Sequence, residues 1–117
     1  MPLKQRTLPQ FAASDQGLWF DNEQGDDDAQ PLDFTTVVAT TWTVTRPDLT
    51  VVVWVPTNSQ QTTTTMVSTY VFASGGVDLA QPGPYRVAIK HTLTTGGTCI
   101  GTGFSFRVVP QDQYEAL

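Results

Sequence analysis

The sequence lacks the features that define several large classes of protein. Its only cysteine, Cys99, excludes an internal disulfide, whereas a small secreted domain would normally carry paired cysteines. No stretch approaches the ~20 consecutive apolar residues of a membrane helix, and no segment has a helical period. The N-terminal Met-Pro-Leu-Lys-Gln-Arg is not followed by the apolar run of a secretory signal. We therefore expect one soluble domain that folds in a cytoplasm, because 117 residues leave room for one core.

Basic residues are also scarce and scattered. The chain has 6 Lys and Arg against 11 Asp and Glu, for a net charge of −5, so a nucleic-acid partner is not expected. The acidic residues gather between Asp15 and Asp33, with no Lys or Arg from Thr7 to Thr45. Asp26–Asp28 lie beside a glycine, but their spacing does not follow that of an EF-hand. A solvated acidic loop is the favoured interpretation, and no metal or cofactor is predicted.

Catalytic chemistry has little support in the sequence. Cys99 lies between glycines with no base nearby, which favours a small buried apolar residue over a nucleophile. His91 is the only histidine, so it cannot form a metal site by itself. Ser68, His91 and Asp78 could be drawn as a hydrolytic triad, yet no nucleophile elbow or oxyanion-hole turn accompanies them. We therefore expect that the protein is not an enzyme.

Residues 1–33 are interpreted as an extended N-terminal arm with one short strand near Leu18–Phe20. The arm holds more large apolar side chains than a free tail would: Leu3, Leu8, Phe11, Trp19 and Phe20. Two interpretations stay open. The arm orders on a neighbouring protein and buries these groups there, or it folds back and covers an open edge of its own sheet. Residues 111–117 are expected to form a polar tail, in which Tyr114 and Leu117 are further candidate partner-binding residues.

From Phe34 onward, β-branched and aromatic runs broken by turn residues predict several short strands. In the first strand, Val38, Trp42 and Val44 are expected on the inward face and alternating threonines on the outward face. Val51–Val55 is predicted to be a strand covered on both sides, and Pro56–Thr65 a polar loop. Residues 66–73 predict a further strand whose inward face the alternation leaves undecided.

The segment around Tyr85 carries the most information about fold. Tyr85, Val87 and Ile89 share one face of a predicted strand that follows the turn Pro82-Gly83-Pro84. In immunoglobulin-type sandwiches a tyrosine at this place hydrogen-bonds the backbone a few residues upstream, an arrangement called the tyrosine corner. Pro82, Gly83 and Tyr85 are therefore predicted to form a structural corner, although an ordinary core tyrosine after a turn would show the same pattern.

The C-terminal part predicts a hairpin and a last strand. Thr95-Gly96-Gly97 closes the hairpin, and the strand runs from about Cys99 to Val109 with alternate apolar residues inward, namely Phe104, Phe106 and Val108. Gly101 and Gly103 within it predict a bulge or a close backbone approach. The fold class predicted for residues 34–110 is therefore all-β, a single immunoglobulin-like antiparallel β-sandwich.

The order of these pieces from Pro31 to Pro110 resembles the small immunoglobulin-like domains of tailed-phage virions. The similarity lies in Leu32-Asp33-Phe34, the strand that ends in Arg46-Pro47-Asp48, the turn before Tyr85, and Gly96-Gly97 before a Phe-rich strand. The N-terminal domain of phage baseplate upper proteins and short proteins of the head and connector region share this order. One departure is Leu49, which stands where the family usually has glycine.

The resemblance implies a structural role in a virion made in the host cytoplasm. The protein would bind other virion proteins through its arm and sheet edges, as a capsid, neck, tail or baseplate subunit, and would form a homo-oligomer within the assembly. A carbohydrate-binding module is the alternative, because such sandwiches bind sugars and Trp19 is the tryptophan that the alternation leaves outside the core. A small hydrolase is a weaker third hypothesis.

Overall fold

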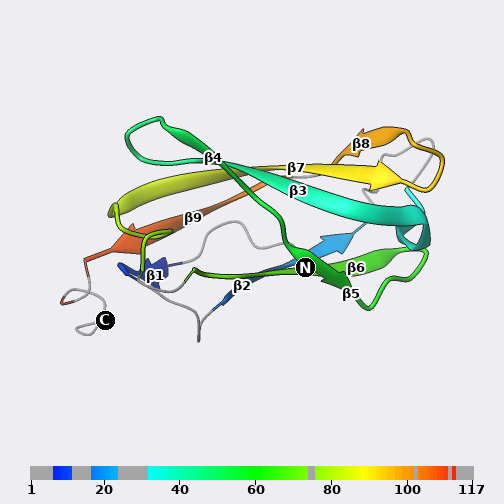
Figure 1. Cartoon of the computed structure of the whole chain (residues 1–117). Coiled ribbons are helices and arrows are strands. Elements are labelled where there is room, and N and C mark those ends of the chain that lie inside the picture. Colours follow the sequence, from blue (N-terminus) through cyan, green and yellow to red (C-terminus); the bar gives the residue numbers. More distant parts are fainter. Residues whose placement is uncertain are drawn as a thin grey trace.

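The computed structural model describes residues 7–11, 17–23, 32–73, 76–101, 103–110 and 112. Two sheets pack face to face as an immunoglobulin-like sandwich, which confirms the predicted fold class (Figure 1). The larger sheet has 6 strands in the order β1-β9-β7-β3-β4, with β8 beside the end of β7. Their bounds are β1 Thr7–Pro9, β3 Val37–Thr45, β4 Val51–Trp54, β7 Gly83–Leu93, β8 Thr98–Ile100 and β9 Phe104–Val109.

The smaller sheet has 3 strands in the order β2-β6-β5. Their bounds are β2 Gly17–Glu23, β5 Thr57–Ser59 and β6 Thr65–Val71. A single turn of 3-10 helix, η1 (Phe34–Thr36), precedes β3, and the Asp33 side chain caps it by accepting from the Thr35 N–H at 3.0 Å. All strand pairs are antiparallel within the described residues except β1 and β9, which run parallel.

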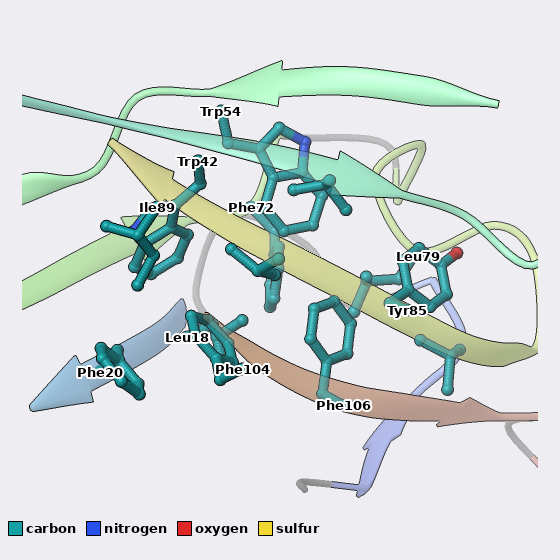
Figure 2. Packing of buried hydrophobic residues seen from close by; sticks show 13 residues of the cluster. Leu18, Phe20, Trp42, Trp54, Phe72, Leu79, Tyr85, Ile89, Phe104 and Phe106 are labelled. Atoms are coloured by element: carbon teal, nitrogen blue, oxygen red, sulfur yellow. The ribbon is translucent and has the colours of Figure 1, made fainter. Parts of the chain in front are cut away.

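Alternating side chains of both sheets form the core between them (Figure 2). Val87 and Ile89 are buried on β7, as predicted, while Arg86, Ala88 and Lys90 face out. Much of the core is aromatic and packed in offset or edge contacts. Phe20 of the smaller sheet stacks on Phe104 of the larger one, with ring centroids 4.6 Å apart. The two sheets are thus joined by direct ring contact as well as by aliphatic packing.

The arm does not stand apart from the sandwich. β1 pairs with β9 and β2 pairs with β6, so residues 7–9 and 17–23 supply strands to both sheets. Leu18 and Phe20 are fully or almost fully buried in the core. The expected boundary between arm and sandwich at residue 34 therefore separates segments that the structure joins. The apolar–polar alternation in residues 7–23 is too short to predict these strands. Their pairing partners lie about 50 and 100 residues away in the chain, so local sequence does not reveal them either.

Two predictions of burial on the larger sheet are wrong, one for Val38 and one for Val51–Val55, and the structure gives the reason for each. Val38 is 61% exposed, because a β-bulge between Val37 and Ala39 shifts the register and turns Val37 inward instead. The strand predicted at Val51–Val55 ends at Trp54 and is covered on one side only. It is an edge strand, and its valines alternate between the core side and the solvent side of the sheet. Val51 and Val53 are therefore exposed, although the apolar run predicted burial on both faces.

The predicted polar loop Pro56–Thr65 contains a strand. After Val55 and Pro56 the chain leaves the larger sheet and forms β5 of the smaller one, which pairs with β6. On β6 the structure also settles the undecided face, since Met66 and Ser68 are buried while Val71 is exposed. Alternation fixes two possible faces for a strand, and only the position of the opposite sheet selects one of them.

Candidate functional site

Among the described residues, one side of the sandwich is lined by the open edges of both sheets. β4 ends the larger sheet and β5 ends the smaller one, and only Val55 and Pro56 separate the two strands. The chain therefore passes from one sheet to the other along this side (Figure 1). We call β4, β5 and the two residues between them the β4/β5 edge. Unpaired backbone groups at such an edge are a template for another strand.

The β4/β5 edge carries none of the charged side chains with which proteins often protect an open edge. No Asp, Glu, Lys, Arg or His occurs from Leu49 to Val77, in a chain with net charge −5. Natural edges are commonly blocked by charged side chains or by proline, and of these the β4/β5 edge has only Pro56. On the opposite side, the edge strand β2 does carry a charged residue, Asp21. The β4/β5 edge thus carries no charged side chain of its own, in an acidic molecule.

The outward face of β4 is apolar. Val51 and Val53 are 59% and 58% exposed, and Val55 directly after the strand is 65% exposed. These residues alternate, so their side chains lie in one row on the solvent side of the larger sheet. Leu49 at the turn before β4 extends the row and is 80% exposed. We call Leu49, Val51, Val53 and Val55 the valine row.

The hairpin between β3 and β4 sets which backbone groups face the open edge. Arg46 donates its N–H to the carbonyl oxygen of Thr50 at 2.9 Å, which makes these two residues a hydrogen-bonded pair across the hairpin. Hydrogen-bonded and non-hydrogen-bonded pairs alternate along an antiparallel ladder. By this alternation Val51 and Val53 are non-hydrogen-bonded partners of β3, so their N–H and C=O groups point away from it. These groups are the ones that a further strand would bind.

Asp48 holds the same hairpin in shape. Its carboxylate accepts hydrogen bonds from the Thr50 N–H at 3.0 Å and the Thr50 hydroxyl at 2.6 Å. The Gln81 side-chain amide donates to the other oxygen at 3.0 Å, which ties the hairpin to the loop before β7. The hydrogen bonds from Thr50 are the main reason that the pKa of Asp48 is lowered from its ordinary value. The start of the valine row is therefore held by a network of its own.

Trp54 anchors β4 to the core from its inward side. Its ring stacks on Tyr70 of β6 with centroids 4.6 Å apart and planes 4° apart. The Tyr70 hydroxyl donates to Asp78 Oδ2 at 3.1 Å, and the backbone N–H of Ala73 donates to the same oxygen at 2.7 Å. Burial, together with the charge of Asp78, raises the pKa of Tyr70 to about 12. Tyr70 therefore stays protonated and the stacked pair keeps β4 in place.

A chain of buried and partly buried hydrogen bonds anchors β5. The Asn58 amide donates to Thr40 Oγ1 at 2.8 Å, and its oxygen accepts from the Ser68 hydroxyl at 2.7 Å. Ser68 in turn accepts from the Asn22 amide at 3.0 Å. The chain crosses from β3 in the larger sheet to β5, β6 and β2 in the smaller one. Satisfied polar networks in a core fix one arrangement of the elements that they join.

His91 ends this chain on the larger sheet. Its Nδ1 lies 2.8 Å from Thr40 Oγ1. Thr40 Oγ1 also accepts from the Asn58 amide, so this contact joins the imidazole to the hydrogen-bond chain that anchors β5. His91 is 1% exposed, and burial lowers its pKa from the ordinary value near 6.5. His91 is thus bonded within the core, to a neighbouring strand of the same sheet.

The residues considered for hydrolytic chemistry do not come together. Ser68 bonds Asn58 and Asn22, Asp78 bonds Tyr70 and Ala73, and His91 bonds Thr40. Each therefore has its own structural partners. Cys99 is partly exposed rather than buried, because β8 lies at the margin of the sheet. Among the described residues, no three His, Cys, Asp or Glu side chains are grouped so as to hold a metal ion.

The predicted corner at Tyr85 is present. The Tyr85 hydroxyl donates to the backbone carbonyl of Gln81, four residues upstream, at 2.7 Å. Tyr85 is fully buried and stacks on Phe106, with centroids 4.8 Å apart. Gly83 has φ 128°, and a Cβ there would lie 2.9 Å from the Pro47 ring, so glycine is required at this place. Pro82 is exposed in the turn before it. The corner fixes the start of β7 beside the β3–β4 hairpin.

The close backbone approach predicted at the glycines of the last strand is also present. A Cβ on Gly103 would lie 2.5 Å from the Val87 carbonyl oxygen, and one on Gly101 would lie 2.9 Å from His91 Nε2. The predicted strand is interrupted here, so that β8 and β9 are separate. The interruption lets the chain run close to β7 on both sides of the break.

The predicted partner-binding residues have different fates. Phe20 is 2% exposed in the core, so in the folded domain it is not offered to a partner, and Leu8 is partly buried against the same core. Phe11 is 52% exposed, although its backbone N–H is held by Leu79 O at 3.0 Å. Trp19 is 49% exposed on the outer face of the smaller sheet. Leu3, Tyr114, Leu117 and Asp26–Asp28 lie outside the described residues.

Sequence reasoning missed the β4/β5 edge as a particular site. The signal that could have revealed it is the uncharged segment from Leu49 to Val77, together with the alternating valines. The pattern alone did not show which strands end the sheets, because strand order depends on contacts between distant segments.

No helix of the described residues is long and apolar enough to cross a membrane.

Comparisons with known proteins add no family. No family model matches the chain, and no curated protein matches it in sequence. Among solved structures, CopC from Methylosinus trichosporium OB3b is 11% identical with a TM-score of 0.49, covering 92% of this chain and 86% of CopC. AggA, the major subunit of aggregative adherence fimbriae type I from Escherichia coli, is 9% identical with a TM-score of 0.43, covering 94% and 91%.

Proposed function

We propose that this chain is a non-enzymatic structural domain that joins other proteins in an assembly through its β4/β5 edge. The observation that carries the proposal is the valine row on an edge without charged side chains. Exposed apolar side chains beside unpaired strand groups suit the addition of a strand from another protein, in which backbone hydrogen bonds give affinity. The edge is held from inside by Trp54 and Asn58. Because it is already ordered, little conformational entropy is lost when a partner binds.

The setting that we propose is a tailed-phage virion, where the domain would be a capsid, neck, tail or baseplate subunit. Support for the setting comes from the order of strands and turns between Pro31 and Pro110. The lack of a clustered acid–base pair among the described residues is in keeping with a structural role. The partners would be other virion proteins.

The test of this function is the protein content of particles. Phage particles would be purified on a density gradient from the strain that carries the gene, and their proteins quantified by mass spectrometry. The expected result is this chain at a fixed ratio to the major capsid protein. A matched strain in which Val53 is replaced by Lys should yield particles that have lost the chain, whereas Val71→Lys on the smaller sheet should retain it. Particles without the wild-type chain would refute the virion setting.

Carbohydrate binding is a second candidate, favoured by Trp19. Its indole is half exposed on the outer face of the smaller sheet, where the paired positions are Thr69 and then Thr57. An exposed aromatic ring beside short polar side chains is a platform on which a sugar ring could stack. A glycan array probed with the wild type and with Trp19→Ala tests this. Specific binding that the substitution abolishes would support the sugar function over the assembly function.

A further inference from the structure

We propose that the strand added to the β4/β5 edge is β4 of a second copy of this chain, paired antiparallel about a two-fold axis near Val53. The inference deepens the proposed function by naming the partner, and it rests on the same edge. Two-fold pairing is the commonest form of homo-oligomer, and it requires a surface that is complementary to itself.

The charge distribution favours a second copy. Each copy carries a net charge of −5, so two copies repel one another over most approaches. The segment Leu49–Val77, which contains the whole β4/β5 edge, carries no charged side chain. This edge is therefore a surface where two acidic molecules meet without placing like charges together. A partner selected by opposite charge would find no group to bind here.

The geometry of β4 is self-complementary. An axis perpendicular to the larger sheet keeps the outward face of both copies outward, so the two valine rows become neighbours on one continuous sheet. With Val53 opposite its own copy, Val51 lies opposite Val55 of the other chain. The N–H and C=O groups of Val51 and Val53 point to the open edge by the ladder alternation, so they are available for the pairing. Apolar side chains then face apolar side chains along the row.

The size of the contact indicates a modest affinity. Stable interfaces bury about 1,200 Å² or more in total, and β4 contributes only 4 residues. The valine row and the adjacent β5 edge must therefore add to the strand pairing. We expect a reversible dimer that dissociates on dilution, as suits a contact completed within a larger assembly.

The first test is sedimentation velocity of the full chain across a concentration series, at low and high salt. A concentration-dependent dimer is expected, and added salt should strengthen it because salt screens repulsion between the acidic copies. Val53→Lys should weaken self-association at least about tenfold, because like charges would then meet across the axis. Val71→Lys, an equally exposed valine on the smaller sheet, is the matched control and should leave association unchanged.

A charge-swap experiment isolates the predicted geometry. Val53→Lys and Val53→Glu should each be monomeric alone, yet they should form a mixed dimer when combined, because opposite charges then face each other across the axis. Amide exchange by NMR provides a readout without substitutions: the Val51 and Val53 amides should become protected as wild-type concentration rises.

Two outcomes would overturn the proposal. One is a wild-type chain that stays monomeric at all concentrations while the Val51 and Val53 amides exchange freely. The other is a dimer that Val53→Lys does not affect. If the monomeric chain is nevertheless found in particles and Val53→Lys removes it, the edge belongs to a different protein, so self-pairing fails while the proposed assembly function stands.

Discussion

Leu49 closes the β3–β4 hairpin in a backbone conformation that disfavours it. Its φ is 69°, in the left-handed region, where it follows the turn Arg46-Pro47-Asp48. A three-residue hairpin loop normally places glycine here, because a side chain in this region costs roughly 1–2 kcal/mol. Leu49 is 80% exposed, so its side chain returns little packing energy to the isolated domain. We predict that Leu49→Gly stabilises the monomer.

The expected gain is smaller than the full strain energy. Glycine loses more conformational entropy on folding, a cost of about 0.5–1 kcal/mol, so the net stabilisation should be about 0.5–1 kcal/mol. For a domain of this size that corresponds to a rise in Tm of about 2–5 °C. Urea and thermal unfolding at a concentration where the chain is monomeric measure it.

Graded substitutions at Leu49 separate strain from loss of a side chain. Leu49→Ala keeps the Cβ and should be neutral, whereas Leu49→Asn should gain part of the glycine effect, because asparagine tolerates the left-handed region. A Leu49→Gly variant that is less stable than wild type would refute the strain argument, as would equal gains from alanine and glycine. In the dimer we expect the opposite trend, because the leucine extends the valine row.

Two further predictions concern the buried hydrogen bonds. Tyr85→Phe removes the bond to the Gln81 carbonyl and leaves that group without its partner, so chemical denaturation should show a loss of about 1–2 kcal/mol with an unchanged m-value; no loss would show that the corner contributes packing only. Burial lowers the pKa of His91 in the folded state, so the unfolded chain binds a proton at a higher pH than the folded chain does. Stability should therefore be full above about pH 7 and fall as the pH drops through 6.5 toward the folded pKa, with a slope of up to about 1.4 kcal/mol per unit. His91→Gln should remove that slope between pH 5.5 and about 7, and a slope that persists in this variant would assign the dependence to other groups.

The sequence identified strands whose partners are close in the chain. The hairpin at Thr95–Gly97 and the inward face of β7 followed from local turn chemistry and alternation, because both signals lie within a few residues of the structure that they specify. The corner at Tyr85 was predicted for the same reason. The bulge at Val37 and the strand β5 were missed, since each depends on a partner strand that shifts or pairs the local backbone.

The candidate site was less accessible to sequence reasoning than the fold. The apolar run at Val51–Val55 was interpreted as buried on both faces, and the apolar residues of the arm as the partner surface. Phe20 is instead part of the core, and the alternate valines of β4 are exposed. Composition alone does not distinguish a central strand from an edge strand, because both are rich in β-branched residues.

The sequence by itself determined the fold class, the turns, the inward face of β7 and the uncharged character of the segment Leu49–Val77. The tertiary structure decided which strands lie at the edges, that residues 17–23 complete the smaller sheet, and which valines face water. The physical reason is the range of the interactions. Turn chemistry and side-chain alternation act between neighbours in the chain, whereas strand order and exposure are set when distant segments compete for the same hydrogen-bonding partners and the same core.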